Sequence, residues 1–223
     1  MASHIVKQGE HLSRIAHDHG FSNYGSIWHH PENAGLKQLR QDPNILFPGD
    51  RLFIPDREER IESVPTEQRH RFQLTGRGLK LRIALHNLAG DPVQGAHCQF
   101  IVEMDDTELA TDGRGMVQKR IPPTAENGSL IIHETTARSP LHIPLQIGHL
   151  DPIDTESGQK ARLNNLGYLA GDLEEVPSGD NDAQRLRLQF RSAVEEFQCD
   201  FNLTVDGICA ENTQAKLKEV HGC

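Results

Sequence analysis

Histidine is the residue type in this sequence with the clearest potential for metal chemistry, and the chain has 13 of them. Zinc sites on a helix commonly place two histidines on one face, as in the H-E-x-x-H motif. That motif does not occur here. His17 and His19 are two residues apart, so on a helix their side chains point to different faces. We therefore expect polar, solvated histidines, also for the pair His29–His30, and no metal site.

Acidic pairs and serines are the other candidates for catalysis. The pairs Asp105–Asp106 and Glu174–Glu175 are neighbours in the sequence, whereas a glycosidase needs two carboxylates that face each other across a cleft. A serine nucleophile on a strand-to-helix elbow needs the pattern G-x-S-x-G, which is absent around Ser157, Ser178 and Ser192. The sequence predicts no catalytic centre, no enzyme activity and no cofactor.

Charge and hydropathy exclude two classes of partner. The formal net charge is −9, and residues 151–223 carry 14 acidic and 7 basic side chains, which disfavours nucleic acid as a partner. No apolar run approaches the roughly 18 residues that cross a bilayer. The start of the chain also lacks a basic segment followed by an apolar one. We expect no membrane insertion and no Sec signal peptide.

The four cysteines do not form a metal-binding pattern, because no two of them have C-x-x-C spacing. Cys199 and Cys209 bracket a short loop that can close as a disulfide, which would stabilise a small domain by roughly 2–3 kcal/mol. The alternative is two buried thiols without a bridge. The sequence leaves both open, and with them the redox compartment.

Changes in hydrophobic periodicity divide the chain into modules, as expected for a multidomain α+β protein. Residues 1–56 mix short strands with helical spacing, and residues 57–68 are charged and poor in apolar side chains, which is typical of a linker. Residues 69–150 alternate with a period of two, which predicts an all-β domain. Residues 151–223 return to helical spacing.

The N-terminal module has the predicted order β-α-α-β. It comprises a strand at 4–6, a helix from 11 to the stop at Gly20, a helical stretch over 24–41 and a strand at 51–54. It opens with V-K-Q-G-E-x-L-S-x-I-A and closes with N-I-L-F-P-G-D-x-L-F-I-P. Residues 4–55 thereby resemble a LysM module. The resemblance implies binding of the N-acetylglucosamine-containing glycan of peptidoglycan or chitin.

The LysM resemblance also implies which residues form the sugar groove. Two turns would lie side by side and present backbone N–H and C=O groups to an acetamido sugar, and Ile45 or Leu46 could supply an apolar floor for its methyl group. The alternative is that these turn residues serve only the fold. The implied glycan-binding residues are Gly9, Glu10, His11, Leu12, Asn44, Ile45 and Leu46.

The long segment between the two turns distinguishes this module from a typical LysM. With Trp28 in its middle, it resembles LysM units found with phage tails and bacterial contractile secretion machinery. Trp28 could stack on a sugar. We favour a structural role for it, as a cover for the enlarged core.

The central module is expected to contain strands at 71–75, 79–86, 97–103, 116–121 and 129–135. Its turns, G-x-P-V-x-G-A followed by T-D-x-x-G, resemble those of Ig-like or prealbumin-like sandwich domains. The resemblance implies a spacer or a docking surface.

The C-terminal module is expected to contain three helices, over 158–169, 182–201 and from 211 onward. In the first helix, which Gly167 should end, an apolar stripe is expected from Ala161, Leu163, Leu166 and Leu169. In the second helix the expected stripe is Leu186, Phe190, Ala193, Val194 and Phe197. Its pattern L-G-Y-L…A-V-x-x-F-Q…L-T-V-D-G-I-x-x-x-N-T-Q-A-K-L strongly resembles the three-helix peptidoglycan-binding domain often attached to cell-wall hydrolases, over residues 158–221. Asp206 and Gly207 should form a tight turn, and Thr213 should lie near the start of the last helix. The resemblance implies that these three residues contribute to ligand binding.

Together, these features predict a non-catalytic protein that binds peptidoglycan glycan, with two wall-binding modules acting together. The tail-associated type of LysM implies an adaptor or cargo-associated component of a contractile injection (type VI secretion-like) system, which docks on a spike, hub or effector protein. The expected location is the bacterial cytoplasm, with delivery to the periplasm by the machine. The alternatives are a cell-wall hydrolase with an unrecognised active site and a cytosolic protein-docking module that does not bind sugar.

Overall fold

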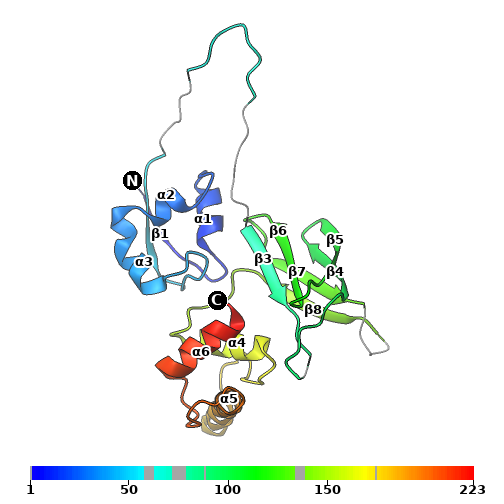
Figure 1. Ribbon diagram of the computed structural model, residues 1–223. Helices are drawn as coiled ribbons and strands as arrows, with labels where there is room; N and C mark the ends of the chain where they lie inside the picture. Colours follow the sequence, from blue (N-terminus) through cyan, green and yellow to red (C-terminus); the bar gives the residue numbers. More distant parts are fainter. Residues whose placement is uncertain (1, 58–62, 72–78, 88, 134–138, 174) are drawn as a thin grey trace. The chain divides into compact units, whose positions relative to one another are not determined.

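The computed structural model describes all residues except 1, 58–62, 72–78, 88, 134–138 and 174 (Figure 1). The chain divides into two compact units, residues 1–149 and 150–223. The first unit contains two separate hydrophobic cores and the second contains one. No helix among the described residues is long and apolar enough to cross a bilayer.

The N-terminal segment is a two-stranded antiparallel sheet whose strands enclose all of its helices in the sequence. Strand β1 pairs with strand β2 along their whole length, from Ala2 opposite Ile54 to Ile5 opposite Arg51. The first and last elements of the segment are therefore paired with each other, and the small helices lie between them in the sequence. The elements are β1 (Ala2–Ile5), α1 (Leu12–Asp18), α2 (Gly25–Trp28), the 3-10 helix η1 (Pro31–Asn33), α3 (Ala34–Arg40) and β2 (Arg51–Ile54).

The predicted continuous helix over 24–41 is wrong, because the chain breaks it into α2, η1 and α3. Pro31 lacks a backbone N–H and disfavours helical geometry in the residue before it, and His30 is extended, with φ −65° and ψ 137°. Asn33 stabilises the break. Its buried side chain donates to the backbone oxygens of Ile27 and Phe53, both at 2.8 Å, and accepts from Phe53 N at 2.8 Å.

The core of this segment follows the apolar positions of α1, α2 and β2. Leu12, Ile27 and Leu52 are fully buried, and Trp28 is only 4% exposed and belongs to the same core. The interpretation of Trp28 as a structural residue is confirmed. A tryptophan this deeply buried does not offer its ring face to a sugar.

The central part of the first unit consists of two antiparallel sheets around one core. One sheet pairs β3 with β6, and the other has the strand order β5-β4-β7-β8. Both sheets contribute to the core, with Phe100 and Leu130 from the larger sheet and Val117 and Ile121 from the smaller one. The strands are β3 (Leu79–Ala84), β4 (His97–Val102), β5 (Asp105–Ala110), β6 (Met116–Ile121), β7 (Asn127–Ile132) and β8 (Leu141–Gln146).

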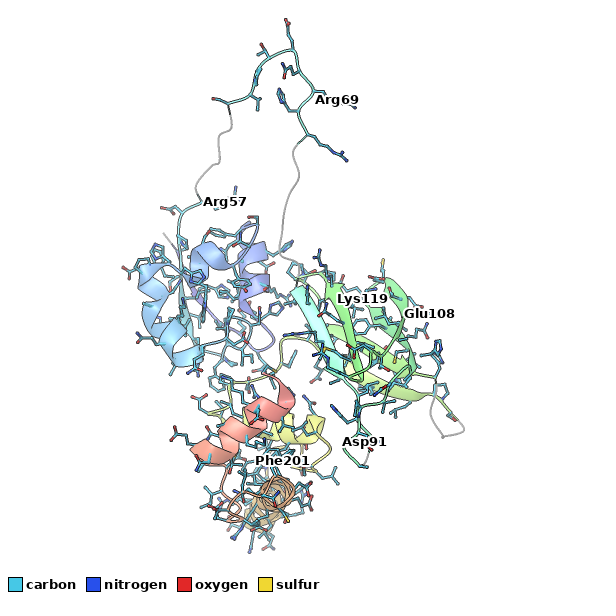
Figure 2. The ribbon with its side chains drawn as sticks, viewed as in Figure 1. Arg57, Arg69, Asp91, Glu108, Lys119 and Phe201 are labelled. Carbon is cyan, nitrogen blue, oxygen red and sulfur yellow. The ribbon has the colours of Figure 1, made fainter. Side chains whose placement is uncertain are left out.

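Two of these strands, β5 and β8, were not predicted, and both lie at the edges of the larger sheet. Strand β5 has the sequence DDTELA and begins with the acidic pair Asp105–Asp106, where Asp105 lies 2.8 Å from Lys119 of β6 (Lys119 is labelled in Figure 2). Strand β8 contains Pro144, which an edge strand tolerates. None of the residues of these two edge strands is fully buried. Their sequences therefore show only a weak alternation of apolar and polar residues, which makes such strands difficult to predict. Most of the predicted strand at 71–75 lies outside the described residues.

The second unit is a three-helix domain with α4 (Glu156–Asn165), α5 (Asp180–Asp200) and α6 (Glu211–His221). Leu163, Val194, Phe197 and Leu217 are completely buried and form its core. The apolar stripe predicted for the second helix is confirmed, since its members Leu186, Phe190, Ala193, Val194 and Phe197 are buried or half-buried.

The first helix of this unit starts two residues before its predicted range of 158–169, whereas its end before Gly167 agrees with the predicted stop. It begins at Glu156, because Thr155 caps it by accepting a hydrogen bond of 3.0 Å from Gly158 N. It ends at Asn165, followed by a turn in which Gly167 has φ +95°. Leu169 was expected on the buried stripe, but it lies beyond the helix and is 79% exposed.

Candidate functional site

The two N-terminal turns do lie side by side, as predicted. Leu12 N donates to Pro43 O at 3.1 Å, and Ser13 Oγ donates to Asn44 Oδ1 at 2.9 Å. Gly9 has φ +82°, a backbone conformation that favours glycine. The backbone of residues 9–12 and 43–46 is therefore held together at the start of α1.

The expected apolar floor is not on the surface. Leu12 is fully buried, and Ile45 and Leu46 are 9% and 4% exposed. Leu46 packs in the core with Leu12, so these side chains stabilise the fold. A ligand at these turns would contact backbone groups and the half-buried Gly9, Glu10 and Asn44.

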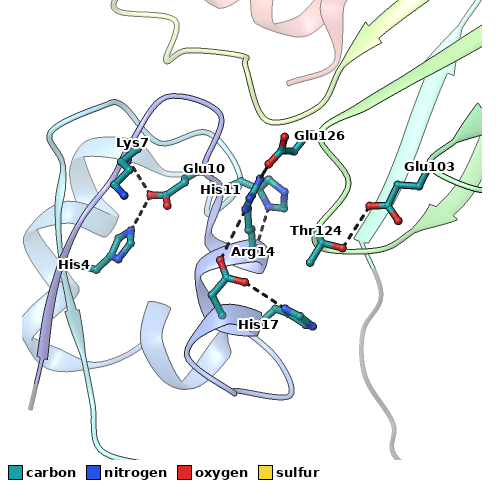
Figure 3. Close-up of polar contacts among 10 residues, drawn as sticks. His4, Lys7, Glu10, His11, Arg14, His17, Glu103, Thr124 and Glu126 are labelled. Atoms are coloured by element: carbon teal, nitrogen blue, oxygen red, sulfur yellow. Dashed lines mark hydrogen bonds and ion pairs between the residues drawn. The ribbon is translucent and has the colours of Figure 1, made fainter.

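The Glu10 side chain stabilises the first turn through contacts with His4 and Lys7 (Figure 3). Its Oε2 lies 2.7 Å from His4 Nε2 and accepts a hydrogen bond of 2.9 Å from Lys7 N. Partial burial raises the pKa of Glu10, but the hydrogen bonds from His4 and Lys7 outweigh burial, so its pKa lies below the ordinary value. The carboxylate therefore stays ionised and ties β1 to the turn.

His11 is the N-cap of α1 and is 2% exposed. Its Nδ1 accepts a hydrogen bond of 3.4 Å from Arg14 N (Figure 3), while Nε2 has no hydrogen-bond partner among the described residues. Burial, and secondarily the charge of Arg14, lower the pKa of His11 to about 4. At neutral pH the side chain is thus a neutral imidazole that caps α1.

In the second unit, the predicted residues Asp206, Gly207 and Thr213 are brought together by Gln198, near the end of α5. Its Nε2 donates to Asp206 Oδ1 at 2.8 Å, to Thr213 Oγ1 at 3.0 Å and to Ile208 O at 3.1 Å. Its Oε1 accepts from the backbone N–H groups of Asp206 and Gly207, both at 3.0 Å. One buried amide therefore holds the loop between α5 and α6.

The Asp206–Gly207 turn is as tight as predicted. Asp206 Oδ1 accepts from Ile208 N at 2.8 Å, and this bond, together with that from Gln198, lowers the pKa of Asp206. Gly207 has φ +70°, and a Cβ there would lie 2.6 Å from Arg191 Cγ. Glycine is needed both for the backbone angle and for the close approach of the Arg191 side chain.

Next to this turn is an open hollow of about 670 Å³, here called the α5–α6 hollow. Thr213 is 4% exposed and bonds to Gln198, so it supports the hollow from inside. Sequence reasoning did not single out Gln198, although it is part of the F-Q pair in the pattern that carried the resemblance. The lining includes Asn202, Leu203, Ile208, Asn212, Lys216 and Glu219.

Neither Cys199 nor Cys209 forms a disulfide in the structure: Cys199 is exposed and Cys209 is half-buried. The bridge that their spacing permits is therefore not formed. The alternative prediction, two buried thiols without a bridge, holds only for Cys209. Burial raises the pKa of Cys209 to about 11.

No three His, Cys, Asp or Glu side chains in the described part of the chain lie close enough together to hold a metal ion. A smaller hollow of about 320 Å³ in the β-domain has the carboxylates of Glu103 and Glu126 in its lining. Thr124 Oγ1 lies 3.5 Å from Glu103 Oε1 (Figure 3). This hollow is where a hydrolase site would have to be tested.

Comparison with known proteins identifies the second unit. Searches among curated proteins and among solved structures gave no match for the chain. Residues 159–217 match the family model described as a putative peptidoglycan binding domain. The matched range covers most of α4, all of α5, the Asp206–Gly207 turn and most of α6. This part of the chain is similar to peptidoglycan-binding domains, which supports a general role in binding peptidoglycan.

Proposed function

We propose that this protein is a non-catalytic peptidoglycan-binding protein. The observation that carries the proposal is the family match over 159–217, which falls on a three-helix domain with a preorganised turn and an adjoining hollow. The Gln198 hydrogen bonds order this turn before any ligand arrives, which reduces the entropy cost of binding.

We propose further that the N-terminal segment is a LysM module that contributes a second, glycan-directed contact. Its support is the sequence resemblance together with the adjacent turns at Gly9 and Asn44. Two weak modules on one chain bind a polymeric wall more tightly than either alone, because the second contact becomes intramolecular. The central domain, of Ig-like or prealbumin-like type, then acts as a spacer or docking surface.

Sedimentation with insoluble peptidoglycan tests this proposal. The purified full chain is expected to enter the pellet, and chains lacking residues 1–56 or residues 158–223 are each expected to bind less. Because the proposal assigns binding to the modules and not to the linker, replacing residues 57–68 with a flexible sequence of equal length should leave binding intact. A full chain that stays in the supernatant at low and moderate salt would exclude wall binding and favour the protein-docking alternative.

The proposed context is a contractile injection system, with the protein docking on a spike, hub or effector. In this proposal the protein resides in the bacterial cytoplasm and is delivered to the periplasm by the machine. Its support is the resemblance of the N-terminal segment to tail-associated LysM units. A tagged chain is expected to co-purify with a spike or effector component, and equal export by cells without the apparatus would contradict this context.

The competing proposal is a wall hydrolase, and it rests on the presence of two carboxylates, those of Glu103 and Glu126, in the lining of one hollow. We expect no soluble muropeptides after long incubation with peptidoglycan, with or without zinc. Release of fragments that disappears in Glu103→Gln or Glu126→Gln, while a Glu108→Gln control still releases them, would establish an enzyme.

A further inference from the structure

The α5–α6 hollow has two walls of different character. One wall is the loop after α5, which presents the exposed Asn202, the half-buried Leu203 and Ile208, whose side chain is 61% exposed. The other wall is one face of α6, where Asn212, Lys216 and Glu219 follow at spacings of four and three residues. The hollow therefore combines side-chain amides, apolar groups, one ion pair and the carboxylate of Asp206, whose Oδ1 already accepts hydrogen bonds from Gln198 and Ile208 N.

Lys216 is held in a defined position within this hollow. Its Nζ lies 3.0 Å from Glu219 Oε1 and 5.4 Å from the ring centroid of Phe201 (Phe201 is labelled in Figure 2). The Lys216 side chain is 30% exposed, whereas that of Glu219 is 69% exposed. An ammonium group has three N–H donors, and Glu219 accepts one of them. Lys216 can therefore donate to a carboxylate of a ligand without first losing much side-chain freedom.

The composition of the lining distinguishes between the two halves of peptidoglycan. The flat C–H faces of pyranose rings pack well on aromatic rings, but in the described part of the chain no aromatic side chain lines this hollow. A peptide stem offers backbone amides, small alanine methyl groups and carboxylates. Asn202 and Asn212 suit the amides, Leu203 and Ile208 suit the methyl groups, and Lys216 suits a carboxylate.

We propose that the α5–α6 hollow binds the peptide stem of peptidoglycan and not its glycan strand, with Lys216 as the residue that binds a stem carboxylate. This inference rests on the proposed function, because it names the part of peptidoglycan that the C-terminal domain recognises. The glycan strand would then be left to the N-terminal segment.

Titration calorimetry of the full chain with a synthetic stem pentapeptide tests the inference. The stem is expected to bind the unaltered chain, and Lys216→Ala is expected to weaken binding about tenfold or more, as for loss of a charge-assisted hydrogen bond. Lys216→Arg keeps the charge and should retain most of the affinity. Lys218→Ala removes a lysine from the same helix outside the hollow and should leave the affinity unchanged. Equal thermal stability of the variants excludes a folding defect.

The outcomes separate this inference from the proposed function. If the chain sediments with peptidoglycan but the stem pentapeptide does not bind, or binds Lys216→Ala equally well, the inference is wrong and wall binding stands. The same conclusion follows if Lys216→Ala abolishes binding of an N-acetylglucosamine tetramer. If the chain does not sediment with peptidoglycan at all, the proposed function itself fails.

Discussion

The buried amide of Gln198, in the last turn of α5, donates a hydrogen bond of 3.0 Å to Thr213 Oγ1 in the first turn of α6. Gln198 is 1% exposed and Thr213 is 4% exposed, so water cannot replace either partner easily. The same amide accepts from two backbone N–H groups of the intervening turn. The shape of the α5–α6 hollow therefore depends on one almost completely buried side chain.

Gln198→Leu should destabilise the second unit and disorder the Asp206 turn. Leucine fills similar space but leaves the N–H groups of Asp206 and Gly207 without their acceptor, which costs about 3 kcal/mol. Hydrogen exchange of peptides covering 201–212, measured by mass spectrometry, should show a large loss of protection. Gln184→Leu, at an exposed position of the same helix, is the control. Unchanged protection in Gln198→Leu would show that the turn is held by other contacts.

Gly207→Ala should destabilise the domain for two separable reasons. Its φ of +70° costs about 1–2 kcal/mol for a residue with a Cβ, and that Cβ would also collide with Arg191. Gly167→Ala should be destabilised only by its backbone angle, φ +95°, because no atom lies within 4 Å of the added Cβ. In chemical denaturation, the free energy of unfolding should therefore be lower for Gly207→Ala than for Gly167→Ala. Adding Arg191→Ala to both variants should reduce the difference between their free energies of unfolding. Equal stabilities would refute the steric part.

Acidification should loosen the N-terminal segment through His11. Its pKa is about 4 in the folded chain, below the ordinary 6.5, so the unfolded chain binds more protons between these two values. Stability is therefore retained above about pH 6.5 and lost as the pH falls towards 4, by at most about 3 kcal/mol.

Hydrogen exchange of α1, compared between variants at the same pH, measures this effect. His11→Ser keeps an N-cap oxygen but has no titrating ring, so its protection should not fall between pH 6.5 and 4. His17→Ser, at an exposed position of the same helix, should behave like the unaltered chain. A pH response that survives in His11→Ser would place the titrating group elsewhere.

Cys199, at the end of α5, and Cys209, in the loop that follows, should differ in reactivity. Cys199 is exposed, whereas burial raises the pKa of Cys209 to about 11. At pH 8, iodoacetamide should modify Cys199 in the folded chain well before Cys209, and denaturation should remove the difference. Mass spectrometry without reduction reads both sites. A Cys199 that resists alkylation until a reductant is added would show that the bridge forms after all.

Some of the fold follows from the sequence because it depends on local patterns. The spacing of Leu186, Val194 and Phe197 predicts one helix face, and that face is buried. The tight turn at Asp206 and Gly207 is equally local, since the Asp206 side chain accepts a hydrogen bond from Ile208 N, two residues on, and the intervening Gly207 has a positive φ. The family resemblance of the C-terminal part likewise needed only the order of residues, and the family match over 159–217 supports it.

Other features were decided only by tertiary structure, because they depend on partners far apart in the chain. Asn33 stabilises the break between α2 and α3 through hydrogen bonds to the backbone of Phe53 in β2. Ile45 and Leu46 were predicted to lie in an exposed turn, but the tertiary structure buries them. The edge strands β5 and β8 exist because β4 and β7 offer them hydrogen bonds. Gln198 gained its role in the same way, from a loop and a helix that fold back onto it. Hydrophobic periodicity predicts which face of a helix or strand is buried. The structural role of a buried amide depends instead on its hydrogen-bond partners, which only the tertiary structure brings together.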